Sequence, residues 1–262
     1  MEVHHHSHTP RKKWTHYFWE FLMLFLAVFC GFLAENFREH KVEEIREKKY
    51  MQALLSDLRS DTALINRCKA QITYVINGHD SLENTLEIAI DNPTFLEKLY
   101  YENTVYTLND FSVNWTEGTL QELKGSGNVR LVTKPGVKEG IQKYEKVKQW
   151  CNDQHNFSNE SVLRTHYFGN DIFDITYYKK YNDFIQNGWP ETIYEPFENV
   201  KKYIADNPRL LTNDKIILKK YLRLVNNEKG QMIIYRNYVE SAEEEALKLI
   251  NTINEQYKFK TQ

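Results

Sequence analysis

Four histidines lie within the first eight residues of the chain, at His4, His5, His6 and His8. Neutral imidazole binds zinc, copper and nickel, so this group could collect a transition metal. A selective metal site also needs neighbouring groups that orient each imidazole, and a short polar tail offers none. An expression-tag remnant is the other interpretation, although Ser7 interrupts the run. We expect no cofactor from these residues.

Histidines and aspartates in the middle of the chain could supply acid–base chemistry. His155 and His166 are close in sequence to Asp153, Asp171 and Asp174, and a His–Asp pair can transfer protons during catalysis. Hydrogen bonding in polar loops explains the same residues equally well. The chain has neither a nucleophile elbow nor an HExxH motif. We therefore predict that the protein is not an enzyme.

The glycine-rich sequence LKGSGNVRLVTKPG (residues 123–136) could suggest an anion-binding loop. It lacks the Lys-Ser/Thr pair in P-loop register. The pattern predicts instead a helix cap and two turns, around Gly125–Asn128 and at Pro135-Gly136.

The three cysteines, Cys30, Cys68 and Cys151, have no metal-ligand spacing. A Cys68–Cys151 disulfide is compatible with a location outside the cytoplasm, but nothing in the sequence requires it. Cys151 lies on an apolar helical face, which favours a packed thiol.

The stretch from Trp14 to Phe37 predicts a membrane-spanning helix. Its centre, Phe21 to Ala34, carries no charge, and Trp14, Tyr17 and Trp19 suit the membrane interface. A helix of about 18–24 residues spans about 27–36 Å, which is enough for a hydrocarbon core of about 30 Å. A helix that is apolar on every face is either a membrane span or a buried core helix, and we expect the membrane span here. A cleaved signal peptide is disfavoured because no small-x-small site follows the run.

One face of this helix carries Glu20, Ala27, Gly31 and Ala34, which are seven, four and three residues apart. Small residues at such spacing let two helices approach closely, and a carboxyl group there can hydrogen-bond a neighbour. The face therefore predicts self-association or binding of a membrane partner. The alternative is an interfacial Glu20 that reaches headgroup water.

Three segments near the N-terminus form a distinctive pattern: MEVHHHSH, then FWEFLMLFLAVFCGFLAENFREH, then REKKYMQALLSDLRSD. This pattern, over about residues 1–61, resembles an uncharacterised family of single-pass membrane proteins from Bacteroidota. The resemblance implies a bacterial inner-membrane protein with native histidines. It implies no activity, so no functional residue is carried over.

The remaining chain predicts a helical body. A formal net charge of −2 shows no basic excess, so we expect no nucleic-acid partner, and only ten glycines and six prolines disfavour a many-turned β fold. A polar helical stalk (residues 38–50) follows the span. A first heptad seam then carries Met51, Leu58, Ile65 and Ile72, and Asn77-Gly78 is expected to end that helix.

A second heptad seam predicts a long C-terminal helix over about residues 213–257, capped by Thr212 or Asn213. It carries Leu218, Val225, Met232, Val239, Ala246 and Ile253. We expect both seams to pack in one bundle, the alternative being an intermolecular coiled coil.

Shorter helices are predicted between these two. One begins at Asn92-Pro93 and another includes Val137 to Cys151, while residues 172–185 are ambiguous between helix and strand.

These patterns together predict an all-α, single-pass protein: a basic tail (1–13), a transmembrane helix (14–37), a stalk (38–50) and a soluble helical domain (51–262) closed by a long C-terminal helix. Arg11, Lys12 and Lys13 precede the span, which favours a cytoplasmic N-terminus and a periplasmic body. We expect a structural or interaction protein of the lipid bilayer that forms a homo-oligomer or binds another membrane or periplasmic protein. The alternative is a ligand-binding sensor module outside the cytoplasm.

Overall fold

The computed structural model describes residues 14–188 and 196–259. Within these ranges the protein is all-α and has no strands, as predicted. The tail, with its four histidines and with Arg11 to Lys13, lies outside the described residues.

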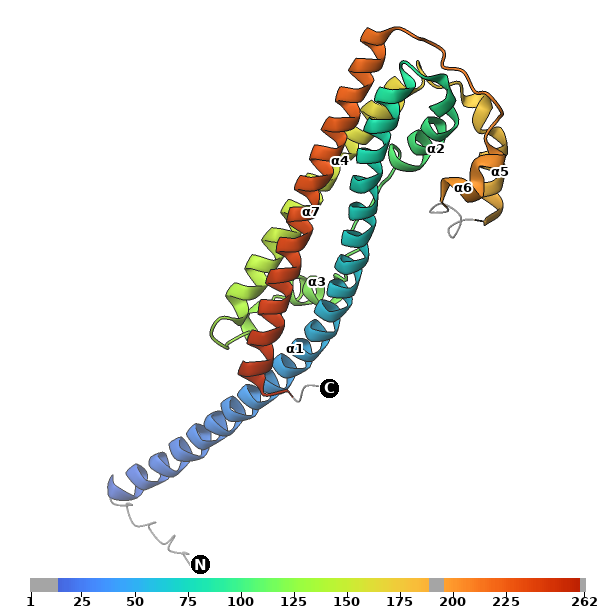
Figure 1. The fold of residues 1–262 in the computed structure, drawn as a ribbon. Coiled ribbons are helices and arrows are strands. Elements are labelled where there is room, and N and C mark those ends of the chain that lie inside the picture. The colour runs from blue at the N-terminus through green and yellow to red at the C-terminus, as the bar shows by residue number, and fades with distance from the viewer. Residues whose placement is uncertain (1–13, 189–195, 260–262) are drawn as a thin grey trace, which may run out of the picture.

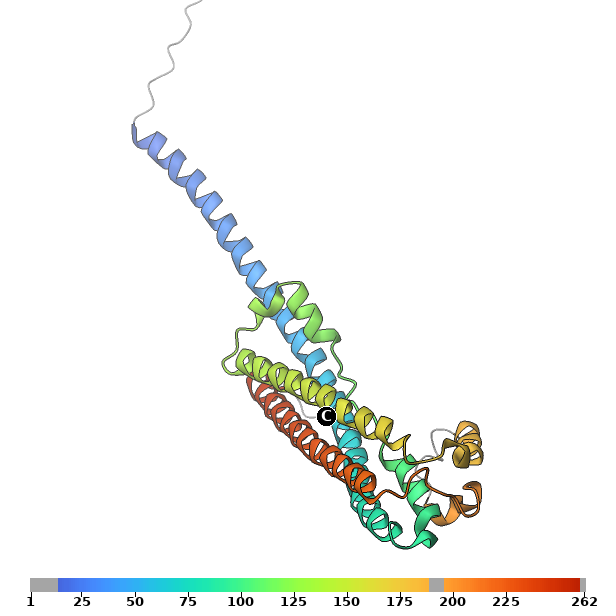
Figure 2. The ribbon, with the colours of Figure 1, turned by 90° about the horizontal axis from the view of Figure 1, so that it is seen from above.

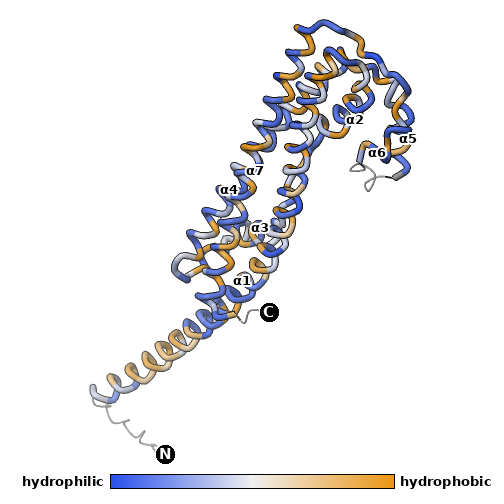
Figure 3. Tube along the Cα trace, viewed as in Figure 1, coloured by the Kyte–Doolittle hydropathy of each residue, from blue (hydrophilic) through white to orange (hydrophobic). Residues whose placement is uncertain are grey.

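Helix α1 (Trp14–Ala89) is one uninterrupted helix of 76 residues. At 1.5 Å per residue it is about 114 Å long. Its first part stands clear of all other elements and is apolar all round, while its second part enters the bundle (Figures 1 and 3). This N-terminal part is long and apolar enough to cross a membrane. The predicted membrane helix, the stalk and the first heptad seam are therefore consecutive segments of one continuous helix.

The predicted helix end at Asn77-Gly78 is wrong. Gly78 is buried inside α1, and a Cβ atom there would lie 2.1 Å from Cδ1 of Tyr106. Glycine is needed at this position because the Tyr106 ring packs directly on the backbone, and no left-handed cap is formed. The helix continues for three more turns to Ala89.

Helix α7 (Lys215–Tyr257) packs along both α1 and α4 (Val137–Gly169), so three long helices lie side by side (Figures 1 and 2). The predicted cap of α7 is displaced by one residue. Asp214, not Thr212 or Asn213, is the cap, and its Oδ1 accepts a hydrogen bond from the backbone N–H of Ile216 at 2.7 Å. Thr212 supports it by accepting from the Asp214 N–H.

The two heptad seams face each other within one chain. Ile65 and Met232 are buried in the same apolar cluster, as are Ile72 and Val239. A second cluster lies nearest the exposed N-terminal part of α1 and contains Met51, Leu54, Leu58, Leu249 and Ile253. A third lies at the opposite end of the bundle and contains Leu82, Leu86, Leu99, Tyr100 and Tyr221. The seams thus form an intramolecular core.

A buried carboxylate of α1 links three segments by hydrogen bonds at the point where the stalk meets the bundle. Glu47 accepts hydrogen bonds from the backbone N–H of Thr133 at 2.7 Å and from the hydroxyl of Tyr257 at 2.5 Å. The end of α7 and the loop before α4 are thereby joined to α1.

Shorter helices complete the fold. Helices α3 (Gly118–Gly125) and η2 (Asn128–Leu131) lie at the end of the bundle nearest the exposed part of α1. The distal lobe contains η1 (Pro93–Phe95), α2 (Leu96–Tyr106), η3 (Ile175–Tyr178), α5 (Lys179–Gly188), α6 (Phe197–Val200) and η5 (Lys201–Tyr203).

Both predicted turns are confirmed, since Gly127 and Gly136 have left-handed φ values of 69° and 77°. The ambiguous residues 172–185 are mainly helical, in η3 and α5, with one antiparallel bridge between Phe173 and Leu210.

Candidate functional site

The four residues predicted for helix association, Glu20, Ala27, Gly31 and Ala34, are all exposed on the free part of α1. No atom lies within 4 Å of a Cβ built on Gly31. Glu20 Oε1 lies 2.9 Å from Nε2 of His16, one turn earlier. The face is therefore open to a neighbouring helix.

The predicted acid–base residues are not brought together. His155 Nε2 lies 2.5 Å from Oδ1 of Asp110, an aspartate from a different segment. Asp174 caps η3 by accepting from the Thr176 N–H. His166 contacts the neighbouring Tyr167 ring. In the described ranges, no group of three or more His, Cys, Asp or Glu side chains could hold a metal ion.

Cys68 and Cys151 are both buried free thiols in the middle cluster. The Tyr235 hydroxyl lies 3.9 Å from Cys68 Sγ. Burial raises the pKa of Cys68 to about 11 and that of Cys151 to about 12. Both side chains therefore stay protonated at neutral pH, which makes them poor nucleophiles.

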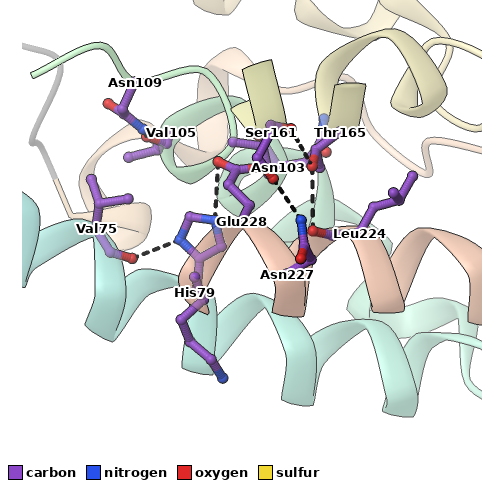
Figure 4. A network of polar contacts seen from close by, with 12 residues as sticks. Val75, His79, Asn103, Val105, Asn109, Ser161, Thr165, Leu224, Asn227 and Glu228 are labelled. Atoms are coloured by element: carbon purple, nitrogen blue, oxygen red, sulfur yellow. Dashed lines mark hydrogen bonds and ion pairs between the residues drawn. The ribbon is translucent and has the colours of Figure 1, made fainter. Parts of the chain in front are cut away.

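A buried polar layer crosses the bundle at His79 of α1 and Glu228 of α7 (Figure 4). Both side chains are fully buried, and His79 Nε2 lies 3.1 Å from Glu228 Oε1. His79 Nδ1 lies 2.9 Å from the carbonyl oxygen of Val75 and must donate to it, because a carbonyl can only accept. The second imidazole nitrogen is thus the one that faces the carboxyl group.

A hydrogen bond between Nε2 and the carboxyl group needs one proton, because neither an unprotonated Nε2 nor a carboxylate oxygen can donate. Burial raises the pKa of Glu228, and the nearby His79 only partly opposes this. Neither oxygen of Glu228 has a partner in full hydrogen-bond geometry among the described residues. The carboxyl group is therefore buried, and hydrogen bonds compensate little for its lost hydration.

Helix α4 contributes hydroxyl groups to the same layer. Thr165 donates to the carbonyl oxygen of Ser161 at 3.0 Å, and Asn227 of α7 donates to the Ser161 hydroxyl at 2.9 Å. The layer therefore ties all three long helices together at one level (Figure 4).

The sequence did carry a signal for this pair. His79 lies seven residues after Ile72 and continues the first seam. Glu228 lies midway between Tyr221 and Tyr235, at a companion position of the second heptad seam. The signal was missed because the first helix was expected to end at Gly78.

A cavity of about 210 Å³ opens near the polar layer, in the distal lobe. Its lining comes from α2 and the loop after it, the end of α4, the following loop, η3 and α5. The lining residues are Asn103, Thr104, Thr107, Leu108, His166, Gly169, Asn170, Phe173, Ile175, Tyr178 and Asn182.

Asn103 connects the cavity to the bundle core. Its amide donates to the Tyr178 hydroxyl at 3.0 Å, and its carbonyl oxygen accepts from the Tyr221 hydroxyl. Burial, with a smaller effect of Glu228, raises the pKa of Tyr221, so this phenol stays a donor. Tyr221 and Glu228 are two turns apart on the same face of α7.

Comparison with known proteins identifies no relative of this chain: no family model, no curated protein and no solved structure matches it. Its function is therefore argued from its own geometry.

Proposed function

We propose that this protein is a membrane-anchored interaction protein that assembles through its anchor. The observation that supports this is the continuity of α1, whose exposed N-terminal part is apolar on every face and whose C-terminal part is core of the bundle. An apolar surface of this kind is unfavourable in water and favourable in lipid. A rigid helix without a break would hold the bundle at a fixed distance from the bilayer.

We place the anchor in a bacterial inner membrane, with the N-terminus in the cytoplasm and the bundle in the periplasm. The basic residues before the span support this orientation, since positive charges favour the cytoplasmic side. The resemblance to single-pass proteins of Bacteroidota supports the compartment.

The association surface that we propose is the face of Glu20, Ala27, Gly31 and Ala34. The test is crosslinking of the full chain in native membranes. Gly31→Leu should reduce crosslinking strongly by keeping the helices apart, and Glu20→Gln should largely preserve it because an amide still hydrogen-bonds. Glu20→Leu should weaken it only modestly, since such bonds in membranes average about 0.6 kcal/mol.

Phe29→Leu is the matched control, because Phe29 lies on the opposite face of the same helix. It should leave crosslinking unchanged. Equal crosslinking of the wild type and Gly31→Leu would contradict this association surface and leave Glu20 as an interfacial residue.

A second candidate function is a ligand-binding module of the sensor type. The observation that favours it is the distal cavity, where polar side chains from α2, α4, α5 and the segments between them converge on one space. Convergent polar groups in a concave site are typical of small-molecule binding. Binding of small molecules to the full chain, and its loss when the cavity lining is changed, is the test of this candidate.

A further inference from the structure

The distal cavity has the size of a single small ring. Its volume of about 210 Å³ is below the range of about 300–1,000 Å³ that holds drug-sized ligands. A ligand that fits this cavity is therefore smaller than a nucleotide or a peptide.

The polar lining of the cavity is uncharged apart from one imidazole. It consists of three amides (Asn103, Asn170, Asn182), three hydroxyl groups (Thr104, Thr107, Tyr178) and His166. Among the described residues, no Lys, Arg, Asp or Glu lines it. A charged ligand would lose its hydration there without gaining an ion pair, which is unfavourable. The lining thus favours a neutral ligand.

Part of this lining is already held in place by internal hydrogen bonds. Thr107 donates to the backbone carbonyl of Asn103 at 2.6 Å, and Asn103 donates to Tyr178. By contrast, the side chains of His166, Asn170 and Asn182 form no hydrogen bond or ion pair to another described residue. Amides both donate and accept, so these groups suit a ligand that does both, as a hydroxyl group does.

The cavity also has an apolar side. Phe173 lies in its wall and is 4% exposed, whereas Leu108 and Ile175 at its edge are 53% and 70% exposed. Large apolar side chains in such positions would be covered by the carbon face of a ring. Amides on one side and apolar groups on the other match a molecule with hydroxyl groups around an apolar ring.

We propose that this cavity binds a small neutral polyhydroxylated ring, of the chemical class of a monosaccharide or cyclitol. The inference rests on the ligand-binding candidate function above and names its ligand class. It does not depend on how the anchor associates.

The test is ligand-observed NMR on the full chain in lipid nanodiscs, because detergents with sugar headgroups would compete. The neutral probes are D-glucose, D-galactose and myo-inositol. The comparison probes are glucuronate, glucosamine and cyclohexanol, which carry a negative charge, a positive charge and a single hydroxyl group. At least one neutral probe should bind with a Kd of about 1 mM or tighter, and at least tenfold more tightly than every comparison probe.

Asn170→Leu and Asn182→Leu should each weaken this binding by roughly tenfold, because each removes one hydrogen-bonding amide. Both residues are exposed at the edge of the cavity, so thermal unfolding should be unchanged. Asn251→Leu, at an exposed position near the other end of α7, is the matched control and should bind like the wild type.

Two results would overturn the proposal in different ways. Preferential binding of a charged or monohydroxyl probe, lost in the Asn170 and Asn182 variants, would refute the ligand class but retain the ligand-binding function. Binding of none of the six probes, or binding equal in both variants and the control, would refute the ligand class and remove the support for a sensor module.

Discussion

At the scale of single residues, the buried carboxyl groups in the helical seams differ in how well they are satisfied. Asp61 is buried but accepts from the Tyr144 hydroxyl and the Thr116 N–H, each at 2.6 Å. Glu47 likewise has several donors. Glu228 is approached by His79 and Thr165, but its two oxygens lack hydrogen bonds of full geometry among the described residues. A poorly satisfied buried carboxyl group makes stability depend on pH.

We predict that Glu228 makes the protein less stable as the pH rises above 4.5. Its pKa in the folded protein is raised above this ordinary value, so above pH 4.5 the Glu228 carboxyl group binds more protons in the folded state than in the unfolded state. Its contribution is complete below pH 4.5 and is lost as the pH rises through the folded pKa. The measurement is the free energy of unfolding from pH 4 to 8 for the wild type and Glu228→Gln.

The stability of Glu228→Gln relative to the wild type should therefore increase with pH, because glutamine does not titrate. Glu255→Gln, at an exposed position on the same helix, should show no such trend. A stability difference for Glu228→Gln that stays constant across this pH range would show that the buried pair does not exchange protons on unfolding.

A second prediction compares two glycines inside helices. Gly78→Ala should destabilise the protein by about 1–3 kcal/mol, because the new Cβ atom overlaps the Tyr106 ring. Gly230→Ala should instead stabilise it by up to about 1 kcal/mol, because nothing lies within 4 Å and alanine favours the helix. Thermal unfolding of both variants is the measurement. Similar shifts of the same sign would show that Gly78 has no packing role.

At the scale of the elements, the bundle depends on the seam between α1 and α7. Ile65 and Met232 are 0% and 4% exposed in the same cluster. Truncation of either residue to alanine should lower the free energy of unfolding by about 2–5 kcal/mol, from lost burial and the cavity left behind. Denaturant unfolding of each single variant measures this.

Ile234→Ala provides the comparison, since Ile234 is two residues from Met232 and is 42% exposed. Its cost should be about 0.5 kcal/mol, as for most surface changes. If Ile65→Ala and Met232→Ala cost no more than Ile234→Ala, the two seams do not form a common core in solution.

At the scale of the whole molecule, helix α1 joins the proposed anchor to the bundle without a break. The bundle should therefore lie on the side of the membrane where the anchor has its C-terminal end. We predict that a C-terminal alkaline phosphatase fusion is active in bacteria, because an N-terminal anchor with a short basic tail directs the domain after it across the membrane. A C-terminal fusion to a fluorescent protein that reports a cytosolic location should give no fluorescence. An inactive phosphatase together with a fluorescent reporter would reverse the proposed orientation.

The sequence by itself determined the features that depend on short-range patterns. The uncharged run from Phe21 to Ala34 predicts a helix that could cross a membrane, because its composition alone suits lipid as a solvent. Heptad spacing identifies the seams, and the glycines at 127 and 136 identify turns that need a left-handed backbone. The all-α class follows from these same local preferences.

The tertiary structure decided the features that join distant segments. Gly78 lies inside helix α1 rather than at its end, and Tyr106 from another helix packs against its backbone. His79 acquires its role only when α7 places Glu228 against it. The distal cavity exists only because two distant stretches of the chain, residues 103–108 and 166–182, meet around it. Local periodicity describes which face of a helix is apolar, but only long-range packing decides what that face meets.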